Sequence, residues 1–598
     1  MSLVPWRMRY RLIAMTVASL AAAFLDMAGV LAMMPLMQLL TISTGLPRTV
    51  TTYIVPVVHS TDRKHLLLVM TLAICGLFIL KDIVLVAIRW WSIGQMSRAA
   101  AAAQSEVLAR YTHASYASHR KRSRATITQV VANTTLIAVS TPLLSIINII
   151  TDLSSSVLLL ATLIAVSPVA SLIAVVVFGG AAFLMTKLIK PHALRAGLKT
   201  LDNNTESWAY LNPAIEGFRE SRIFGREDSF VESYRRNRMA NTYPERIQQV
   251  LGELPRYLME IVMVVGILVI SLILFSTQDE SVAFGTLGVF AAAAARIGPS
   301  LNRVVAAVNG LRVSRSAVVQ LNEAMDDLAS AESATPDESD PIAVDLDGDI
   351  HVNDVGFHYP DSVEPVLSKV SVTIKRGTTI ALVGSSGAGK STFADLLLGL
   401  QQPTQGQIIV NGYDIPQHPR AWRRNVSAVS QSVYLWNTSL RDLITFGAPP
   451  DQVDPKRLSE AIERAQLKAF IDEMPEGLDT IVGDGGTRLS GGQAQRVGIA
   501  RALYVNPRVL ILDEATSALD NETEHEITRT LDALHGQLTM IIIAHRLSTV
   551  KNADEILFFS RGRLAGRGTM ATLQAENAEF ARLVELGSLD LDGETSSA

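Results

Sequence analysis

The sequence predicts a multidomain membrane protein, in which an all-α part with six transmembrane helices precedes an α/β nucleotide-binding part with a phosphate-binding (P-) loop. Two observations support this fold class. Long apolar stretches dominate the 598-residue chain up to about residue 315, whereas from about residue 345 the composition is that of a soluble α/β protein. The soluble part also contains "GSSGAGKS", a glycine-rich loop between a strand-like and a helix-like segment.

Composition excludes some classes of partner. The formal net charge is −4, so no bulk positive charge favours nucleic acid, and we expect no nucleic-acid partner. The single cysteine, Cys75, lies in an apolar stretch and can form no disulfide within the chain. We interpret it as a small hydrophobic residue.

Six stretches are apolar over about the 20 residues that a helix needs to cross a ~30 Å hydrocarbon core. The first begins near "WRMRYRLIAMTVASLAAAF", which is basic and then apolar like a signal peptide, but the apolar run continues through Leu40 and is too long for one. We therefore expect a first membrane helix there. The expected spans are 12–40, 65–91, 133–165, 169–189, 253–276 and 281–312.

The distribution of Lys and Arg predicts the orientation of these spans. Basic residues cluster before the first span, between the second and third, and between the fourth and fifth, whereas "TQDE" at 277–280 is short and acidic. Both termini and the nucleotide-binding part are therefore expected on the cytoplasmic side of the cell inner membrane. The long charged connections, about 91–132 and 190–252, predict helices that extend well beyond the bilayer.

Ionisable residues inside membrane spans are costly and are functional candidates by default. Lys81 and Asp82 are neighbours, and a satisfied structural network is the favoured interpretation for them. Asp26 and Arg296 have no oppositely charged neighbour one turn away, so a polar cavity is as good an interpretation as a structural one. Asp152 is the fifth such residue.

The polar segment "SAESATPDESDPIAVD" at 330–345 contains two prolines and predicts a linker between the two parts. The expected organisation is a membrane domain at 1–328, a linker at 329–345, a nucleotide-binding domain at 346–585 and a flexible tail at 586–598.

The glycine-rich loop Gly384–Ser391 follows the strand-like "TIALV" and precedes the helix-like "TFADLLLGL". Glycines in this context let backbone N–H groups surround phosphate oxygens at a helix N-terminus. Lys390 then supplies a charge to the β- and γ-phosphates, and Ser391 supplies a hydroxyl to Mg²⁺. ATP and Mg²⁺ are therefore the expected cofactors.

A second buried strand is expected at "RVLIL", directly before Asp513 and Glu514. Asp513 fits the Mg²⁺-binding role that phosphoryl-transfer sites need, and the adjacent carboxylate can polarise an attacking water molecule. Together with the phosphate loop, this pair predicts nucleotide hydrolysis.

The order and spacing of further motifs resemble those of the ABC ATPase domain over about residues 350–585. These motifs are "LSGGQ" at 489–493, "ILDEATSALD" at 511–520 and "IIIAHRLSTV" at 541–550, all after the phosphate loop. With six membrane spans ahead of it, the chain resembles an ABC exporter half-transporter, a membrane translocase driven by ATP hydrolysis.

The resemblance implies a role for each matching residue. Tyr359 would stack on the adenine, Gln431 would contact Mg²⁺ and the coupling helices, and His545 would contact the γ-phosphate. Glu514, His545 and Gln431 form the expected catalytic set, and Ser391, Gln431 and Asp513 the expected metal set. The expected nucleotide contacts are Tyr359, Gly384, Ser385, Ser386, Gly387, Ala388, Gly389, Lys390, Ser391, Thr392, Ser490, Gly491, Gly492, Gln493 and Asp520.

"RLSGGQAQR" at 488–496 provides a second glycine-rich helix start. The resemblance implies that it faces the γ-phosphate held by the phosphate loop of another half-transporter subunit, so that two chains complete each ATP site in a two-fold pair. Because the catalytic set is intact, a homodimer is expected. The coupling helices are expected near 112–122 and 210–226.

Three positions depart from the common family pattern. Ser430 stands where proline is common, Ala494 stands where arginine is common, and "VGDGG" at 482–486 replaces a Val-Gly-Glu-Arg-Gly pattern. These departures leave the ATPase assignment intact and bear on contacts between domains.

The membrane part is similar, over shorter motifs, to the PglK-like flippases of lipid-linked oligosaccharides. These motifs include "AGVLAMMPLMQLL", "EGFRESRIFGREDSF" and "ARIGPSLNRVVAAVNGLR". The resemblance implies a lipid or glycolipid substrate, with Arg296 and Arg303 as candidate pyrophosphate ligands or, equally, as packing residues of the last span. Export of a peptide or hydrophobic drug-like compound is the alternative, and an ATP-gated channel is a third.

Overall fold

The computed structural model describes two compact units, one of Met1–Ala114 with Ser118–Glu332 and the other of Ser333–Ala598 with Ser115–Ala117. The description covers all residues except 1–5, 42–45, 47, 167, 169–170, 173–174, 182, 186, 189–190, 193–194, 196–205, 208–209, 212, 278–279, 333–344, 360–361, 363, 484–485, 514–520, 545–549, 551–552 and 593–598.

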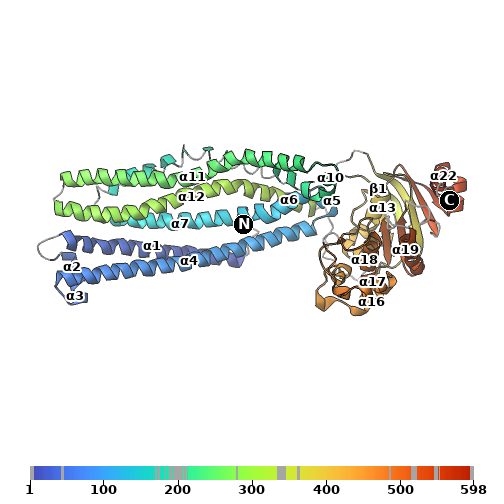
Figure 1. Ribbon diagram of the computed structural model, residues 1–598, viewed down its shortest axis with the longest axis horizontal. Helices are drawn as coiled ribbons and strands as arrows, with labels where there is room; N and C mark the ends of the chain where they lie inside the picture. Colours follow the sequence, from blue (N-terminus) through green and yellow to red (C-terminus); the bar gives the residue numbers. More distant parts are fainter. Residues whose placement is uncertain are drawn as a thin grey trace. The chain divides into compact units, whose positions relative to one another are not determined.

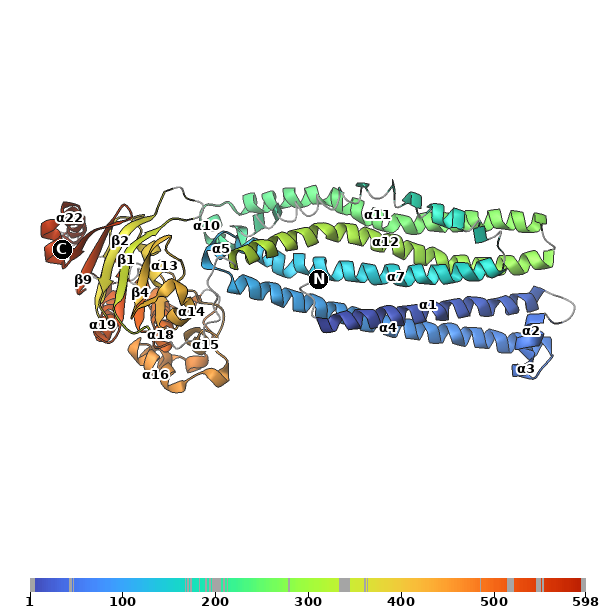
Figure 2. The same cartoon turned by 180° about the vertical axis from the view of Figure 1, so that it is seen from behind.

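The first unit is helical. Its long helices lie side by side (Figures 1 and 2), with α7 packed along α12, α1 packed against α4 and α7, and α11 packed against α12. They are α1 (Trp6–Thr41), α4 (Arg63–His113), α7 (Thr135–Val166), α11 (Glu227–Thr277) and α12 (Glu280–Glu332). The shorter elements are α2 (Arg48–Tyr53), α3 (Val55–Val58), α5 (Tyr116–Arg120), α6 (Arg124–Gln129), η1 (Val130–Thr134), η2 (Val175–Gly179) and α10 (Phe218–Ile223).

Three helical segments in the described part of the chain are long and apolar enough to cross a bilayer: Arg63–His113, Arg124–Ile164 and Glu227–Ser276. A shorter apolar helix, Val175–Met185, lies in the fourth expected span, which falls partly outside the described residues. One face of α4 carries outward-facing apolar side chains, of which Leu72, Ile79 and Val86 are each more than 60% exposed. A surface of this kind suits lipid rather than water, so the chain is a membrane protein.

The helices extend far beyond their apolar parts, as expected from the charged connections. At 1.5 Å per residue, the 51 residues of α4 span roughly 75 Å, more than twice the ~30 Å of a hydrocarbon core. The helices α11 and α12, with 51 and 53 residues, have the same reach. Short helices α5 and α10 occur in the two regions where coupling helices were expected.

Lys81 is fully buried on α4, and its ammonium group lies 3.1 Å from Asp82 Oδ1 and 5.2 Å from the centre of the Phe78 ring. This is the satisfied structural pairing that the sequence favoured. The side chains of Asp26 and Arg296 lie outside the described part of the structure.

The second unit contains two sheets. An antiparallel sheet has the order β2-β1-β4-β5, and a six-stranded sheet has the order β10-β9-β3-β8-β7-β6. Strands β9, β3, β8, β7 and β6 are parallel, and only β10 is antiparallel to its neighbour. The strands are β1 (Ile350–Phe357), β2 (Leu367–Ile374), β3 (Thr379–Val383), β4 (Gln405–Val410), β5 (Tyr413–Asp414), β6 (Val426–Val429), β7 (Val509–Asp513), β8 (Thr539–Ile543), β9 (Glu555–Ser560) and β10 (Arg563–Gly568).

The parallel strands at the centre of the larger sheet, β3 and β8, are buried along their whole length, which is why they are continuous apolar runs rather than alternating ones. Helices cover this sheet, and the unit is the expected α/β domain. They are α13 (Lys390–Leu397), α14 (Pro419–Arg423), α15 (Leu440–Thr445), α16 (Pro455–Arg464), α17 (Lys468–Glu473), α18 (Gly491–Tyr504), α19 (Asn521–Leu534), α21 (Met570–Glu576) and α22 (Ala578–Asp592), with 3₁₀ turns η3 (Ile415–Gln417), η4 (Pro450–Gln452) and η5 (Gly477–Asp479).

Two helices run past the boundaries expected from the sequence. Helix α12 continues to Glu332, beyond residue 328, and so includes "SAE" (330–332), the first residues of the polar segment that was expected to be a linker. Helix α22 continues to Asp592, beyond residue 585, where a flexible tail was expected to start. Its "FARLVEL" segment has helical apolar spacing, and Phe580 packs on Phe558 of the core at a centroid distance of 5.5 Å.

Candidate functional site: a nucleotide site and a polar membrane cavity

The order of the parallel strands brings the phosphate loop and Asp513 to one edge of the sheet. Strand β8 lies between β3 and β7, with Leu382 and Asp513 both paired to Ile543. Gly384 directly follows β3, and Asp513 is the last residue of β7. Two strand spacings of about 4.8 Å place their backbones roughly 10 Å apart, which is a suitable separation for residues that hold one nucleotide phosphate chain.

The phosphate loop curls around the Lys390 side chain. The buried ammonium group of Lys390 donates to the carbonyl oxygens of Gly384 at 2.6 Å and Ser385 at 3.0 Å. Helix α13 begins at Lys390, so its free N–H groups point towards the loop. Gly384, Gly387 and Gly389 have φ values of 153°, 78° and 101°, which explains the glycine spacing.

Gly384 and Gly387 give a matched pair of predictions about ATP binding. Both have positive φ, but only at Gly384 would a Cβ atom also collide with a backbone atom, the Phe559 carbonyl oxygen; at Gly387 nothing lies within 4 Å. We expect Gly384→Ala to weaken ATP binding far more than Gly387→Ala. In Gly387→Ala the only expected penalty is the ~1–2 kcal/mol that a residue with a Cβ atom costs in the left-handed backbone conformation. Titration of both variants with a fluorescent ATP analogue measures the difference, and equal losses would contradict the collision.

Tyr359 follows β1 and lies beside the start of α13. Its hydroxyl group is 3.3 Å from Thr392 Oγ1, and its ring meets Phe357 edge-on at 4.9 Å. The phosphate loop and the expected adenine-stacking residue are therefore brought together, although they lie more than 20 residues apart in sequence.

Ser391, Asp513 and Gln431 offer the hydroxyl, carboxylate and amide oxygens that Mg²⁺ prefers. Gln431 is exposed just after β6, which pairs with β7 through Val429 and Leu512. Within the described residues, no group of three or more His, Cys, Asp or Glu could hold a metal without other ligands. This donor set fits Mg²⁺, which typically takes one or two protein ligands and completes its shell with phosphates and water.

Glu514, Asp520 and His545 lie outside the described residues. The structure describes only the segments that lead to them, because β7 ends at Asp513 and β8 is followed by Ala544. Their roles stay predictions.

The "LSGGQ" segment begins α18 with a capping box. Ser490 Oγ accepts a hydrogen bond from the Gln493 backbone N–H at 3.2 Å, and Gln493 Oε1 accepts one from the Ser490 backbone N–H at 2.9 Å. Ser490 and Gly491 are exposed. The helix start is thus pre-formed on the surface, and the Ser-x-x-Gln spacing is the sequence signal for this capping box.

Arg501 fixes the direction of α18. Its guanidinium group donates to the carbonyl oxygens of Leu443 at 2.8 Å and Tyr434 at 2.9 Å, and it lies 5.6 Å and 5.2 Å from the Trp436 and Phe446 ring centres. Burial lowers the pKa of Arg501. These contacts couple the "LSGGQ" helix to the segment that follows Gln431.

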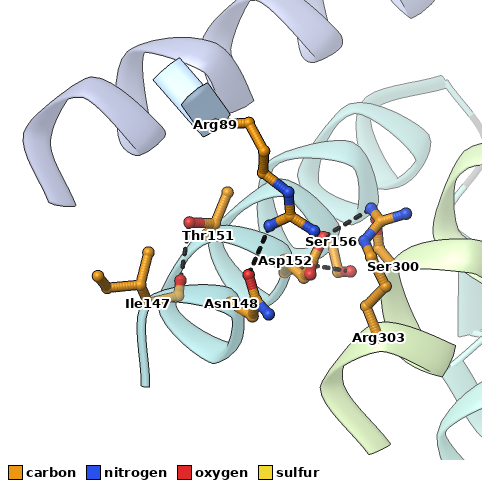
Figure 3. Close-up of polar contacts among 8 residues, drawn as sticks. All are labelled: Arg89, Ile147, Asn148, Thr151, Asp152, Ser156, Ser300 and Arg303. Carbon is orange, nitrogen blue, oxygen red and sulfur yellow. Dashed lines mark hydrogen bonds and ion pairs between the residues drawn. The ribbon is translucent and has the colours of Figure 1, made fainter. Parts of the chain in front are cut away.

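A second polar site lies among α4, α7 and α12 of the first unit. Two adjoining cavities of about 400 Å³ and 330 Å³ are both lined by Arg89 from α4, Asn148 from α7 and Arg303 from α12. Figure 3 shows these side chains and their hydrogen bonds. These three helices contain three of the six expected membrane spans, 65–91, most of 133–165, and 281–312.

An ion pair crosses from α7 to α12 in this site. Arg303 donates to Asp152 Oδ1 from Nε at 2.9 Å and from Nη2 at 2.6 Å, and Nη2 also donates to Ser300 Oγ at 3.0 Å (Figure 3). The Asp152 side chain is 8% exposed and that of Arg303 is 48% exposed. Arg89 Nη1 donates to Asn148 Oδ1 at 2.7 Å.

The guanidinium groups of Arg89 and Arg303 both retain N–H donors that a bound ligand could use. Towards the described residues, Arg89 makes its hydrogen bond through Nη1 alone, and Nη1 of Arg303 makes none. With two guanidinium groups and one carboxylate, the charged side chains lining the cavities have a formal net charge of +1 (2 − 1). The site therefore suits an anionic group.

Asp152 and Arg303 were candidates from the sequence, whereas Arg89 counted only among the basic residues between the second and third spans and Asn148 was not a candidate. The signal for Arg89 was present, because Arg89 lies inside the expected span 65–91 and is ionisable. Asn148 carries no such signal in sequence.

Comparisons with known proteins agree with this geometry. Residues 367–517 match the family model described as ABC transporter. An ATP-dependent lipid A-core flippase from Vibrio cholerae is 44% identical over 239 residues, which are 40% of this chain and 41% of the relative. An ATP-dependent lipid A-core flippase from Pseudomonas putida is 34% identical over 376 residues, which are 62% of this chain and 61% of the relative. The chain thus matches about two fifths to three fifths of the length of these relatives.

A solved structure of a bacterial Atm1-family ABC exporter with ATP bound covers 96% of this chain and 98% of its own chain, at 24% identity and a TM-score of 0.75. Because this match includes both units, the helical unit and the α/β unit together have the fold that this structure has. The fold class expected from the sequence is confirmed.

Proposed function

We propose that this chain, which by its fold and its ATPase domain is an ABC exporter half-transporter, uses ATP to move a phosphate-bearing glycolipid across the membrane. One observation carries the proposal: the same chain contains a formed phosphate loop and an arginine-lined cavity between its membrane helices. The relatives named as lipid A-core flippases support a lipid substrate. A lipid-linked oligosaccharide is the specific class that we propose.

ATP hydrolysis is assigned to the residues at the carboxyl edge of the six-stranded sheet. Backbone N–H groups of the phosphate loop and Lys390 bind the phosphates, and Tyr359 stacks on the base. Bound Mg²⁺, held by Ser391, Asp513 and Gln431, would neutralise charge on the transferred phosphoryl group. Glu514 accepts a proton from the attacking water molecule, and His545 contacts the γ-phosphate.

The functional unit that we propose is a homodimer. In it, the start of α18 in one chain, from Ser490 to Gln493, faces the phosphate loop of the other, and Asp520 is a further proposed nucleotide contact. ATP then favours the closed pair by binding it more tightly than the open pair, and this difference in affinity can drive the membrane helices between two arrangements.

We place the chain in the cell inner membrane with the ATPase domain and both termini in the cytoplasm. The support is the excess of Lys and Arg in the connections on that side. The headgroup would enter the cavity beside Arg89 and Arg303, which donate to its phosphate oxygens.

Substitution of both cavity arginines tests the substrate. In proteoliposomes, a lipid-linked oligosaccharide should stimulate ATP hydrolysis and appear in the opposite leaflet. For R89Q/R303Q we expect the lipid concentration for half-maximal stimulation to rise at least about tenfold, because each hydrogen bond to a charged group is worth ~1.5–3 kcal/mol.

The matched control is Arg235→Gln on α11. Arg235 is exposed, and among the described residues its ion-pair partner is Glu232 on the same helix, at 2.8 Å, so its loss should leave the response to lipid unchanged. Stimulation of the wild type by peptides or hydrophobic drugs, but by no glycolipid, would overturn the proposed substrate class.

A further inference from the structure

Asp152 uses only one of its two carboxylate oxygens. Oδ1 accepts both hydrogen bonds from Arg303, whereas Oδ2 accepts none from the described residues. The side chain is more than nine-tenths buried, yet it lines the cavity of about 330 Å³. The structure therefore presents a charged acceptor to whatever occupies that cavity.

A carboxylate oxygen in a largely buried side chain needs a hydrogen-bond donor, which water or a bound ligand can supply. A bare phosphate or pyrophosphate is a poor donor and is repelled by the Asp152 charge, although it is attracted by Arg89 and Arg303. A hydroxyl group next to the phosphate removes this conflict, because it donates to Oδ2 while the phosphate accepts from the arginines. The occupant that satisfies every group is an anion with attached hydroxyl groups.

The rest of the lining suits the same chemistry. Hydroxyl and amide side chains line the same cavities and can form hydrogen bonds with sugar hydroxyl groups. In the smaller cavity these are Ser92, Asn148 and Thr151, and in the larger one Ser97, Ser140, Thr141, Ser145 and Asn148. The hydroxyl groups of Ser140 and Thr151 already donate to backbone carbonyl oxygens, so these two can only accept.

We infer that Asp152 determines specificity by accepting a hydrogen bond from a sugar hydroxyl group next to the lipid phosphate. This inference rests on the proposed function and narrows it: the substrate is a lipid phosphate or pyrophosphate that carries a sugar, and the same lipid without its sugar is a poor substrate. The Arg303 ion pair orients Asp152 so that Oδ2 remains available.

Two lipids that differ only in the sugar test the inference. Polyprenyl pyrophosphate, with and without an attached oligosaccharide, is titrated into proteoliposomes while ATP hydrolysis is measured. The wild type should respond to the glycosylated lipid at about a tenfold lower concentration, since a hydrogen bond to a charged group is worth ~1.5–3 kcal/mol. Asp152→Asn should abolish most of this difference, chiefly because a higher concentration of the glycosylated lipid is then needed to stimulate ATP hydrolysis.

Two further variants distinguish a loss of sugar specificity from misfolding or a general loss of activity. D152N/R303Q removes both charges of the pair, so no unpaired guanidinium group is left, and it should also lose the preference for the sugar. Ser156→Ala, whose hydroxyl donates at 2.7 Å to the Asp152 backbone carbonyl rather than to the carboxylate, should keep that preference.

The outcomes separate the inference from the proposed function. A D152N variant that keeps the wild-type preference for the sugar overturns the role of Asp152 and leaves the flippase proposal intact. An equal response of the wild type to both lipids would also overturn the role of Asp152 while leaving the flippase proposal intact. If neither lipid stimulates the wild type, the proposed function itself fails, and the inference fails with it.

Discussion

Replacing Glu514 with Gln is expected to lower the rate of ATP hydrolysis by about 10²–10⁴, the usual contribution of a general base. The amide has nearly the same shape but cannot accept the proton of the attacking water molecule. Asp513 ends β7, which β8 separates from β3, the strand that leads into the phosphate loop; Glu514 is the next residue in sequence, and its catalytic role stays a prediction. Phosphate release by the purified protein in liposomes measures the rate.

Binding of ATP should survive this substitution, since Lys390 and the loop glycines are unchanged. The matched control is Glu555→Gln. Glu555 pairs with Ile380 at the amino end of β3, on the opposite edge of the sheet from the phosphate loop, and its loss should not alter turnover. Normal hydrolysis by E514Q would show that the proposed base is wrong.

The α/β unit could be predicted because its signals are local. Strand β3 and the loop after it are adjacent in sequence, and the apolar runs of β3, β7 and β8 reflect burial on both faces of a parallel sheet. The long helices of the first unit were predictable for a similar reason, since an uninterrupted charged segment after an apolar span continues the same helix.

The membrane cavity could not be assembled from the sequence, because its contacts are distant. Asp152 and Arg303 are 151 residues apart, and Arg89 and Asn148 are 59 apart. An opposite charge one helical turn away in sequence identifies pairs within a helix, such as Arg110 with Glu106, but never pairs between helices. Only the packing of α7 along α12 brings the Asp152 carboxylate and the Arg303 guanidinium group together.

The second large effect is expected for Ser490→Arg, which should block ATP hydrolysis while a single chain still binds ATP. Ser490 is the exposed cap of α18, and the proposed dimer places it against the γ-phosphate bound by the partner. A long guanidinium side chain at this position would prevent closure. Loss of the cap itself costs only about 1 kcal/mol, so Ser490→Ala should retain much more activity than S490R.

Mixed dimers can show whether the two loops of one ATP site come from different chains. A dimer of an S490R chain with a Lys390→Ala chain has one site with both faults and one site with none. It should occlude one ATP, whereas each variant alone should occlude none. Two differently tagged chains, purified in tandem and tested for trapped nucleotide, measure this.

The control dimer contains the same two substitutions in a different arrangement. When S490R and K390A are both placed in one chain and paired with a wild-type chain, each ATP site has one fault if the sites are shared. That dimer should therefore occlude none. If the sites were instead complete within each chain, the result would be reversed: the wild-type chain would keep an intact site, and the dimer of two single variants would have none. The pair of dimers thus decides between a shared and a self-contained ATP site.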